Sequence, residues 1–333
     1  MLCGIIKKYF EIDVLMRSPY KEVKAMIYKK FIHPQLRNNA HRVPYNKAVI
    51  YIANIFQSIA FHMKKVPKGI KQSKFTIQVN HLSLKTHVFE PKDSSKKLPC
   101  LLYIHGGAFS YKASMIHKHY ACLYALEANC KVFFPDYHLL PKYPYPTAYE
   151  EVLALYQYLM HHGDELNIDI NRIGIGGDSA GACLSALLCN HIEKENLITP
   201  CAQMLIYPAV DADMQSESMK KYTDTPIWNA KNNQRMWKMY LRNSNEEMKR
   251  NASPMQNVLP SKIPNTYMEA TEFDCLHDEG IFYGLRLQAA GAKVIINDTK
   301  GTYHAYDAAI HKKIVHTHVK QRISFLNDCF YKR

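Results

Sequence analysis

The sequence lacks the features that would direct it into a membrane or out of the cell. No run of about eighteen uncharged apolar residues is present, so no membrane-spanning helix is expected. Lys7 and Lys8 directly follow the short apolar start of the chain, which therefore does not resemble a signal peptide. Nine cysteines are scattered without a Cys-x-x-Cys pair, a pattern typical of free thiols in a reducing compartment. We therefore expect a cytoplasmic protein with no stable membrane anchor.

Acidic residues are scarce in the first third of the chain. Residues 1–98 hold 19 of the 43 Lys and Arg but only 5 of the 29 Asp and Glu. The remaining residues therefore hold 24 basic and 24 acidic side chains, and the whole net charge of +14 lies in the first third. No helix-turn-helix, zinc-finger or RNP signature accompanies the charge, so no nucleic-acid partner is expected. A solvated basic surface is the simpler interpretation. The alternative is a membrane-surface lipase whose basic amphipathic N-terminus binds anionic lipid.

Apolar periodicity divides the chain into a helical start and a longer alternating part. Residues 2–32 and 46–64 show helical spacing, with one possible stripe running from Val49 to Met63. From Phe75 to about Pro91 the period becomes two, which predicts strands. Beyond residue 98 short apolar runs alternate with helical segments, and this alternation predicts an α/β fold with a mostly parallel central sheet flanked by helices. The six apolar runs are Leu101–Ile104, Val132–Phe134, Ile173–Ile175, Met204–Tyr207, Tyr267–Ala270 and Val294–Ile296.

A glycine-rich turn follows the third of these runs. Gly177 to Gly181 has the sequence Gly-Asp-Ser-Ala-Gly, a G-x-S-x-G motif centred on Ser179. Glycines on both sides permit a sharp strand-to-helix turn that exposes the hydroxyl, and the helix that follows directs N–H groups toward it. This context predicts that Ser179 is a nucleophile. A helix-capping serine in an ordinary turn is the structural alternative.

A nucleophilic serine needs a base, and the base needs a carboxylate to orient it. Asp274 falls just past the predicted strand at Tyr267–Ala270, and His304 falls past the strand at Val294–Ile296. Both therefore belong to the sheet edge that carries Ser179, in the chain order serine, acid, histidine. Asp278 lies at the start of the next helix, where the helix dipole accounts for a carboxylate. We therefore predict Asp274 and His304 as the acid and the base.

Acyl transfer also needs N–H donors for the developing oxyanion. The run Leu101–Ile104 is followed by His105-Gly106-Gly107-Ala108-Phe109. Glycines let the backbone approach closely and turn its N–H groups inward. We expect Gly106, Gly107 and Ala180 to donate, and we expect His105 to hold the loop in shape.

Together these segments resemble the hormone-sensitive-lipase-like family of α/β-hydrolase esterases, over about residues 75–330. The resemblance rests on four ordered segments: His105 to Phe109, Gly177 to Gly181, Asp274 to Gly280, and the loop with Gly301 and His304. Asp136-Tyr137-His138-Leu139-Leu140-Pro141 and Ser253-Pro254 resemble further family segments. The main departure is Ala108, which stands where the family has a third glycine.

The resemblance implies an α/β-hydrolase fold and a serine carboxylesterase that acts on short- to medium-chain esters without cofactor or metal. It also implies that the chain divides into two parts: an N-terminal helical cap segment at 1–70, and a catalytic domain at 71–333 with a cap insert at about 213–250. Five aromatic residues are candidates for lining the substrate pocket, with plain core packing as the alternative: Phe109, Tyr111, Trp228, Trp237 and Tyr240.

Other readings of the same residues stay open. A sugar or xenobiotic deacetylase or an amidase would use the same triad, and a catalytically silent small-molecule receptor would use the same fold. The edge strands of the sheet leave a homodimer open.

Overall fold

The computed structural model describes residues 27–92 and 96–332. Most of the helix predicted over residues 2–32 lies outside this range. Its described end, Ile27–Lys30, is a single 3-10 turn. The second predicted helix is confirmed as α2 (Lys47–Met63), which begins where the Asn46 side chain accepts a hydrogen bond from the Val49 amide.

In the described part of the chain, eight strands form one sheet in the order β1-β2-β4-β3-β5-β6-β7-β8. The strands are β1 (Ile70–Val79), β2 (Leu82–Pro91), β3 (Leu98–Ile104), β4 (Lys131–Pro135), β5 (Ile168–Asp178), β6 (Ala202–Ile206), β7 (Asn265–Phe273) and β8 (Val294–Tyr303). Strands β1, β2 and β4 pair antiparallel at one edge, and all other pairs are parallel. The predicted fold class is confirmed.

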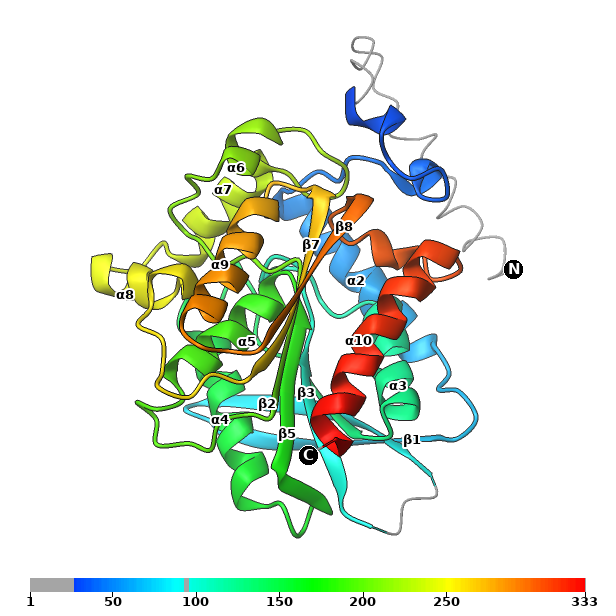
Figure 1. Cartoon of the computed structure of the whole chain (residues 1–333), viewed down its shortest axis with the longest axis vertical. Coiled ribbons are helices and arrows are strands. Elements are labelled where there is room, and N and C mark those ends of the chain that lie inside the picture. The colour runs from blue at the N-terminus through cyan, green and yellow to red at the C-terminus, as the bar shows by residue number, and fades with distance from the viewer. Residues whose placement is uncertain (1–26, 93–95, 333) are drawn as a thin grey trace.

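Helices cover both faces of the sheet (Figure 1). Helices α3 and α10 lie on one face and α4, α5 and α9 on the other. Their bounds are α3 (Met115–Glu127), α4 (Thr147–His161), α5 (Ala180–His191), α9 (His277–Ala289) and α10 (Lys313–Tyr331). Because both faces are covered, the parallel strands β3 and β6 are buried along their whole length, which explains the apolar runs Leu101–Ile104 and Met204–Ile206 within them.

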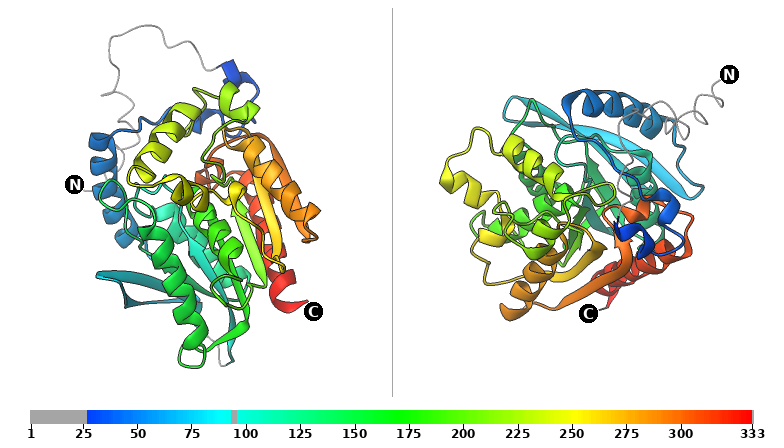
Figure 2. Two further views of the ribbon diagram at one scale, coloured as in Figure 1. Left: turned by 90° about the vertical axis from the view of Figure 1, so that its left-hand side faces the viewer. Right: turned by 90° about the horizontal axis from the view of Figure 1, so that it is seen from above.

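The segment at about 213–250 adds three short helices: α6 (Glu217–Lys221), α7 (Ala230–Tyr240) and α8 (Glu246–Asn251). Helices α6 and α7 lie near the carboxyl ends of β7 and β8, and α8 lies further out, at the left of Figure 1 (Figures 1 and 2). The segment contacts the chain that leads into α2. The Ile227 amide donates to the His41 carbonyl at 2.8 Å, and the Arg42 guanidinium donates to Asp224 at 2.5 Å. Two segments far apart in the sequence therefore meet above the same edge of the sheet.

Candidate active site

Ser179 lies on a strained turn between β5 and α5. Its φ of 54° and ψ of −117° are unusual for a residue with a side chain. A Cβ atom on Gly177 or Gly181 would lie 2.3 or 2.0 Å from the carbonyl oxygen of Ile104, so both flanking glycines are required by close packing. The turn presents the serine hydroxyl at the carboxyl end of the sheet.

The structure brings the three predicted triad residues together. The Ser179 Oγ lies 2.9 Å from His304 Nε2, and His304 Nδ1 lies 2.7 Å from Asp274 Oδ2. Because an ionised carboxylate only accepts hydrogen bonds, Nδ1 carries the proton and Nε2 is free to accept from the serine. Asp274 follows the last residue of β7 and His304 the last residue of β8, so the two strand ends hold the geometry.

Asp274 is fixed by donors of its own. The Thr271 hydroxyl donates to Oδ2 at 2.8 Å, and the Leu276 amide donates to Oδ1 at 3.0 Å. The side chain is fully buried. Asp278, the alternative carboxylate, instead accepts from the Ser218 amide at 2.7 Å and contacts His277. The choice of Asp274 over Asp278 therefore agrees with the geometry.

The prediction that the Gly106 amide serves as an oxyanion donor does not agree with the structure of the loop after β3. The Gly106 amide donates to Asp178 Oδ2 at 3.1 Å, so this N–H is already committed. Within the described chain, the amides of Gly107, Ala108 and Ala180 have no hydrogen-bond acceptor. Gly107 has a φ of 116°, and its carbonyl accepts from the amides of Ser110 and Tyr111, which closes the loop. The available donors are thus Gly107, Ala108 and Ala180, with Ala108 in place of the predicted Gly106.

Asp178, the variable residue of the G-x-S-x-G motif, holds this loop. Besides the Gly106 amide, it accepts from the Tyr103 hydroxyl at 3.1 Å and lies 3.3 Å from His117 Nε2. Burial acts to raise the pKa of Asp178, but His117, His105 and Tyr103 act against it, and the net pKa is below its ordinary value. A buried, ionised carboxylate therefore ties the loop to the nucleophile turn. No sequence pattern predicts this role for Asp178.

His105 contacts the loop as predicted and lies outside the triad's hydrogen bonds. Its ring stacks on Tyr137 with centroids 4.4 Å apart, and its Nδ1 lies 2.7 Å from the Gly106 carbonyl oxygen. Burial, with a smaller effect of His117, lowers the pKa of His105 to about 4. The ring is therefore neutral at pH 7 and donates its Nδ1 proton to the loop.

A buried charge network lies behind His304. Arg322 of α10 is fully buried and donates to both carboxylate oxygens of Glu269, at 3.0 and 2.5 Å, and to Asp307 at 2.7 Å. Asp307 also accepts from the Tyr207 hydroxyl at 2.7 Å, and the Tyr207 ring lies 4.8 Å from the His304 ring. The network thereby holds the Tyr207 ring in place beside the His304 imidazole.

Comparison with known proteins identifies the family. A family model described as the alpha/beta hydrolase fold matches residues 101–308. The chain belongs to the alpha/beta hydrolase fold family. Among curated relatives, it is 27% identical over 243 residues to an ethyl acetate hydrolase of Pseudomonas putida, covering 72% of this chain and 76% of that protein. It is 28% identical over 222 residues to carboxylesterase NlhH of Mycobacterium tuberculosis, covering 66% and 70%.

Solved structures agree with this alpha/beta hydrolase assignment. The chain superposes on a bacterial heroin esterase with a TM-score of 0.83 and 25% identity, covering 91% of this chain and 99% of that one. Esterase LipW from Mycobacterium marinum gives a TM-score of 0.85 at 21% identity, covering 94% and 100%, and supports the fold alone. Among residues 27–92 and 96–332, no helix is long and apolar enough to cross a membrane.

The five aromatic candidates of this alpha/beta hydrolase fall into separate groups. The Trp228 ring lies 6.2 Å from the His304 ring and 5.3 Å from Tyr45. Tyr111 is half-buried and its ring lies 6.1 Å from Tyr45. The other three pack on one another: Phe109 stacks parallel on Tyr240 at 3.9 Å and lies 6.3 Å from Trp237. Trp228 alone among the five contacts a triad ring.

Proposed function

We propose that this protein hydrolyses carboxylic esters through an acyl-enzyme formed on Ser179. The observation that carries the proposal is the continuous hydrogen-bonded chain from Ser179 through His304 to Asp274, on a strained turn at the end of the sheet. The names of the relatives, an ethyl acetate hydrolase and a carboxylesterase, support the same reaction class.

Each triad residue then has one task. His304 Nε2 removes the proton from the Ser179 hydroxyl as its oxygen attacks the ester carbonyl carbon. Asp274 keeps the imidazole in the required tautomer and stabilises its positive charge. His304 next gives this proton to the leaving alkoxide. A water molecule that His304 deprotonates then attacks the acyl-enzyme, and the acid leaves as Ser179 regains its proton.

The oxyanion is bound by backbone amides in this scheme. Gly107, Ala108 and Ala180 supply three N–H groups that no acceptor within the described chain occupies. Removing one such donor typically costs about 3 kcal/mol of transition-state stabilisation. A backbone amide serves as donor whichever side chain follows, so Ala108 fills the place of the family's third glycine without loss of a donor.

Two helical parts form the cap over this site. The described chain between residues 27 and 69 and the insert at 213–250 are joined by the Ile227–His41 and Arg42–Asp224 contacts. Trp228, within the insert, brings an aromatic ring beside His304. This contact supports a cap that bounds the substrate pocket, and the preference for short- to medium-chain esters stays a prediction. Deacetylase and amidase activities use the same groups and are the second candidates.

The thiols support a cytoplasmic location. The eight cysteines in the described chain are all unpaired, and burial raises the pKa of Cys100 and Cys183 well above its ordinary value. Unpaired buried thiols are usual where the compartment is reducing. The homodimer stays a prediction.

The direct test is hydrolysis of p-nitrophenyl acetate, butyrate, octanoate and palmitate by the wild type and by Ser179→Ala. We expect loss of roughly 10⁴-fold or more in the variant, with short acyl chains preferred by the wild type. Ser83→Ala, an exposed serine on β2, is the matched control. A fluorophosphonate should label the peptide that contains Ser179. Equal activity of Ser179→Ala and wild type would refute the nucleophile, and preference for acetylated sugars or amides would replace the ester assignment.

A further inference from the structure

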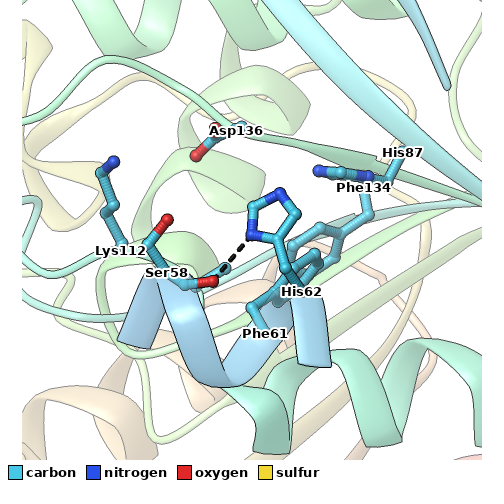
Figure 3. A pocket seen from close by; sticks show the side chains of 8 residues that line it. Ser58, Phe61, His62, His87, Lys112, Phe134 and Asp136 are labelled. Carbon is cyan, nitrogen blue, oxygen red and sulfur yellow. Dashed lines mark hydrogen bonds between the residues drawn. The ribbon is translucent and has the colours of Figure 1, made fainter. Parts of the chain in front are cut away.

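Helix α2 has two faces of different character. Toward the domain, Phe61 is buried and stacks on Phe134 with ring centroids 5.9 Å apart. Figure 3 shows this inner face, where Ser58, Phe61 and His62 line a cavity of about 20 Å³ that also borders β2 and β4. A cavity of this size holds about one water molecule. The inner face of α2 is therefore a packed part of the protein.

The opposite face is apolar and exposed. Ile52, Ile55, Ile59 and Met63 have exposed fractions of 53, 45, 51 and 54%. At about 100° per residue these positions lie roughly 120–200° around the helix axis from Phe61, so they form one stripe that points away from the domain. We call these four residues the α2 stripe. Contiguous exposed apolar side chains on a helix mark an interaction surface, because solvated helix faces are ordinarily polar.

The surroundings of the α2 stripe are cationic. Residues 27–89 contain 11 Lys and Arg and no Asp or Glu. Lys47 begins the helix, and Lys65 and Lys68 are exposed just past its end. The carboxylate of Asp136 lies against the inner face, in the cavity of Figure 3. An occupant of the outer face would therefore meet positive charge around an apolar centre.

We propose that the α2 stripe and its flanking lysines dock on an anionic phospholipid surface, with the helix lying in the plane of the interface. Apolar side chains on one face with lysines beside them are the two features that such binding requires. Charge complementarity favours this occupant over protein ones. A second copy of the chain would bring a net charge of +14, and residues 1–26 would bring 5 Lys and Arg against 3 Asp and Glu.

The inner face of α2 is tied to the loop after β3. Asn54, on the inner face of α2, donates to the Ser110 carbonyl at 2.9 Å and accepts from the Lys112 amide at 2.8 Å. Both residues belong to the loop that also carries Gly107 and Ala108. The helix that carries the α2 stripe is thus hydrogen-bonded directly to this loop. The binding itself is independent of the reaction that the site performs.

The test is co-sedimentation of the full chain with vesicles of phosphatidylcholine alone and of phosphatidylcholine with about one-third phosphatidylglycerol. We expect binding to the anionic vesicles at about 0.1 M salt and its loss near 1 M, where the screening length falls from about 10 to 3 Å. The triple variant Ile52→Gln/Ile55→Gln/Ile59→Gln should bind at least about tenfold more weakly, and so should Lys64→Gln/Lys65→Gln/Lys68→Gln. The control Phe282→Gln/Leu285→Gln changes two exposed apolar residues of α9, 55 and 48% exposed, and should bind like the wild type.

Both tryptophans are buried, so their emission reports whether each variant is folded. Three results would overturn the proposal: no sedimentation of the wild type with anionic vesicles at low salt, equal binding by the folded isoleucine variant, or equal binding to neutral vesicles. Light scattering completes the test. A wild-type dimer that the isoleucine variant converts to a monomer would assign the stripe to a second copy instead.

Discussion

Replacing Arg322 with Met should destabilise the fold and slow the reaction together. Arg322 is fully buried and makes three charged hydrogen bonds, two to Glu269 and one to Asp307. Methionine has a similar length but leaves both carboxylates buried without their cation. Removing one partner of a buried ion pair costs about 3–5 kcal/mol, a large part of the 5–15 kcal/mol by which proteins are ordinarily stable.

The assay is urea unfolding followed by tryptophan emission, with Arg172→Met as the matched control. Arg172 pairs with Asp169 at 2.7 Å and donates to the Phe330 and Lys97 carbonyls at 3.5 and 3.4 Å. Both side chains of the pair are about one-quarter exposed, so water can replace these long bonds and the loss should cost less, about 1 kcal/mol. Burial acts to raise the pKa of Glu269, but Arg322 acts against it and the net pKa is below its ordinary value. This stabilisation is present at neutral pH and is lost as the pH falls through the folded-state pKa, so the difference between wild type and Arg322→Met should shrink in acid.

The effect on the reaction follows from Asp307. This carboxylate also accepts from Tyr207, whose ring rests against His304. We expect kcat to fall about tenfold, equivalent to about 1.4 kcal/mol, with KM little changed, because the loss concerns the imidazole and not substrate contacts. If Arg322→Met costs no more stability than Arg172→Met, the buried charge network does not stabilise the fold.

Two further predictions concern hydrogen bonding and pH. Thr271→Val removes the hydroxyl donor to Asp274 Oδ2 and should lower kcat about fivefold, since one such bond contributes roughly 1 kcal/mol. The control is Thr266→Val, because Thr266 is a buried threonine of the same strand that donates to the Pro264 carbonyl, and its kcat should not change. Equal kcat in both variants would contradict the role of Thr271. Burial lowers the pKa of His87, His105 and His191 to about 4 each. Between about pH 6.5 and 4 the unfolded chain binds protons at these histidines and the folded chain does not. The free energy of unfolding should therefore fall by up to about 1.4 kcal/mol per pH unit per histidine as the pH drops from 6.5 to 4. Urea unfolding at several pH values measures this fall, and a flat profile would contradict it.

The sheet and its helices could be predicted because local pattern and global burial agree. Strands β3, β4 and β6 are buried throughout, and each contains a short apolar run: Leu101–Ile104, Val132–Phe134 and Met204–Ile206. The chain order of Ser179, Asp274 and His304 could be predicted for the same reason. Each residue follows the end of a parallel strand, and parallel strands end at the same edge of a sheet.

The polar contacts around the triad could not be predicted, because they join residues far apart in the sequence. The sequence provides two glycines after His105, but it does not say which amide is free. That depends on where the Asp178 carboxylate points, 72 residues further along the chain. The face of α2 that packs against the domain is a similar case. Helical spacing predicts a stripe of apolar residues, but the side of the helix that packs is decided by the strands beneath it.

One of the missed residues did leave a signal. In α10, Val315, Val319 and Leu326 are buried at helical spacing, and Arg322 occupies the place in the stripe between them. An arginine in an otherwise apolar stripe must either reach water or find carboxylates in the interior, because burying an unpaired charge is prohibitive. Here it finds two, and one of them lies three residues after the histidine of the triad. In this chain, the arginine that breaks the buried stripe therefore indicates what supports the active site, which the composition of the site's own loops does not.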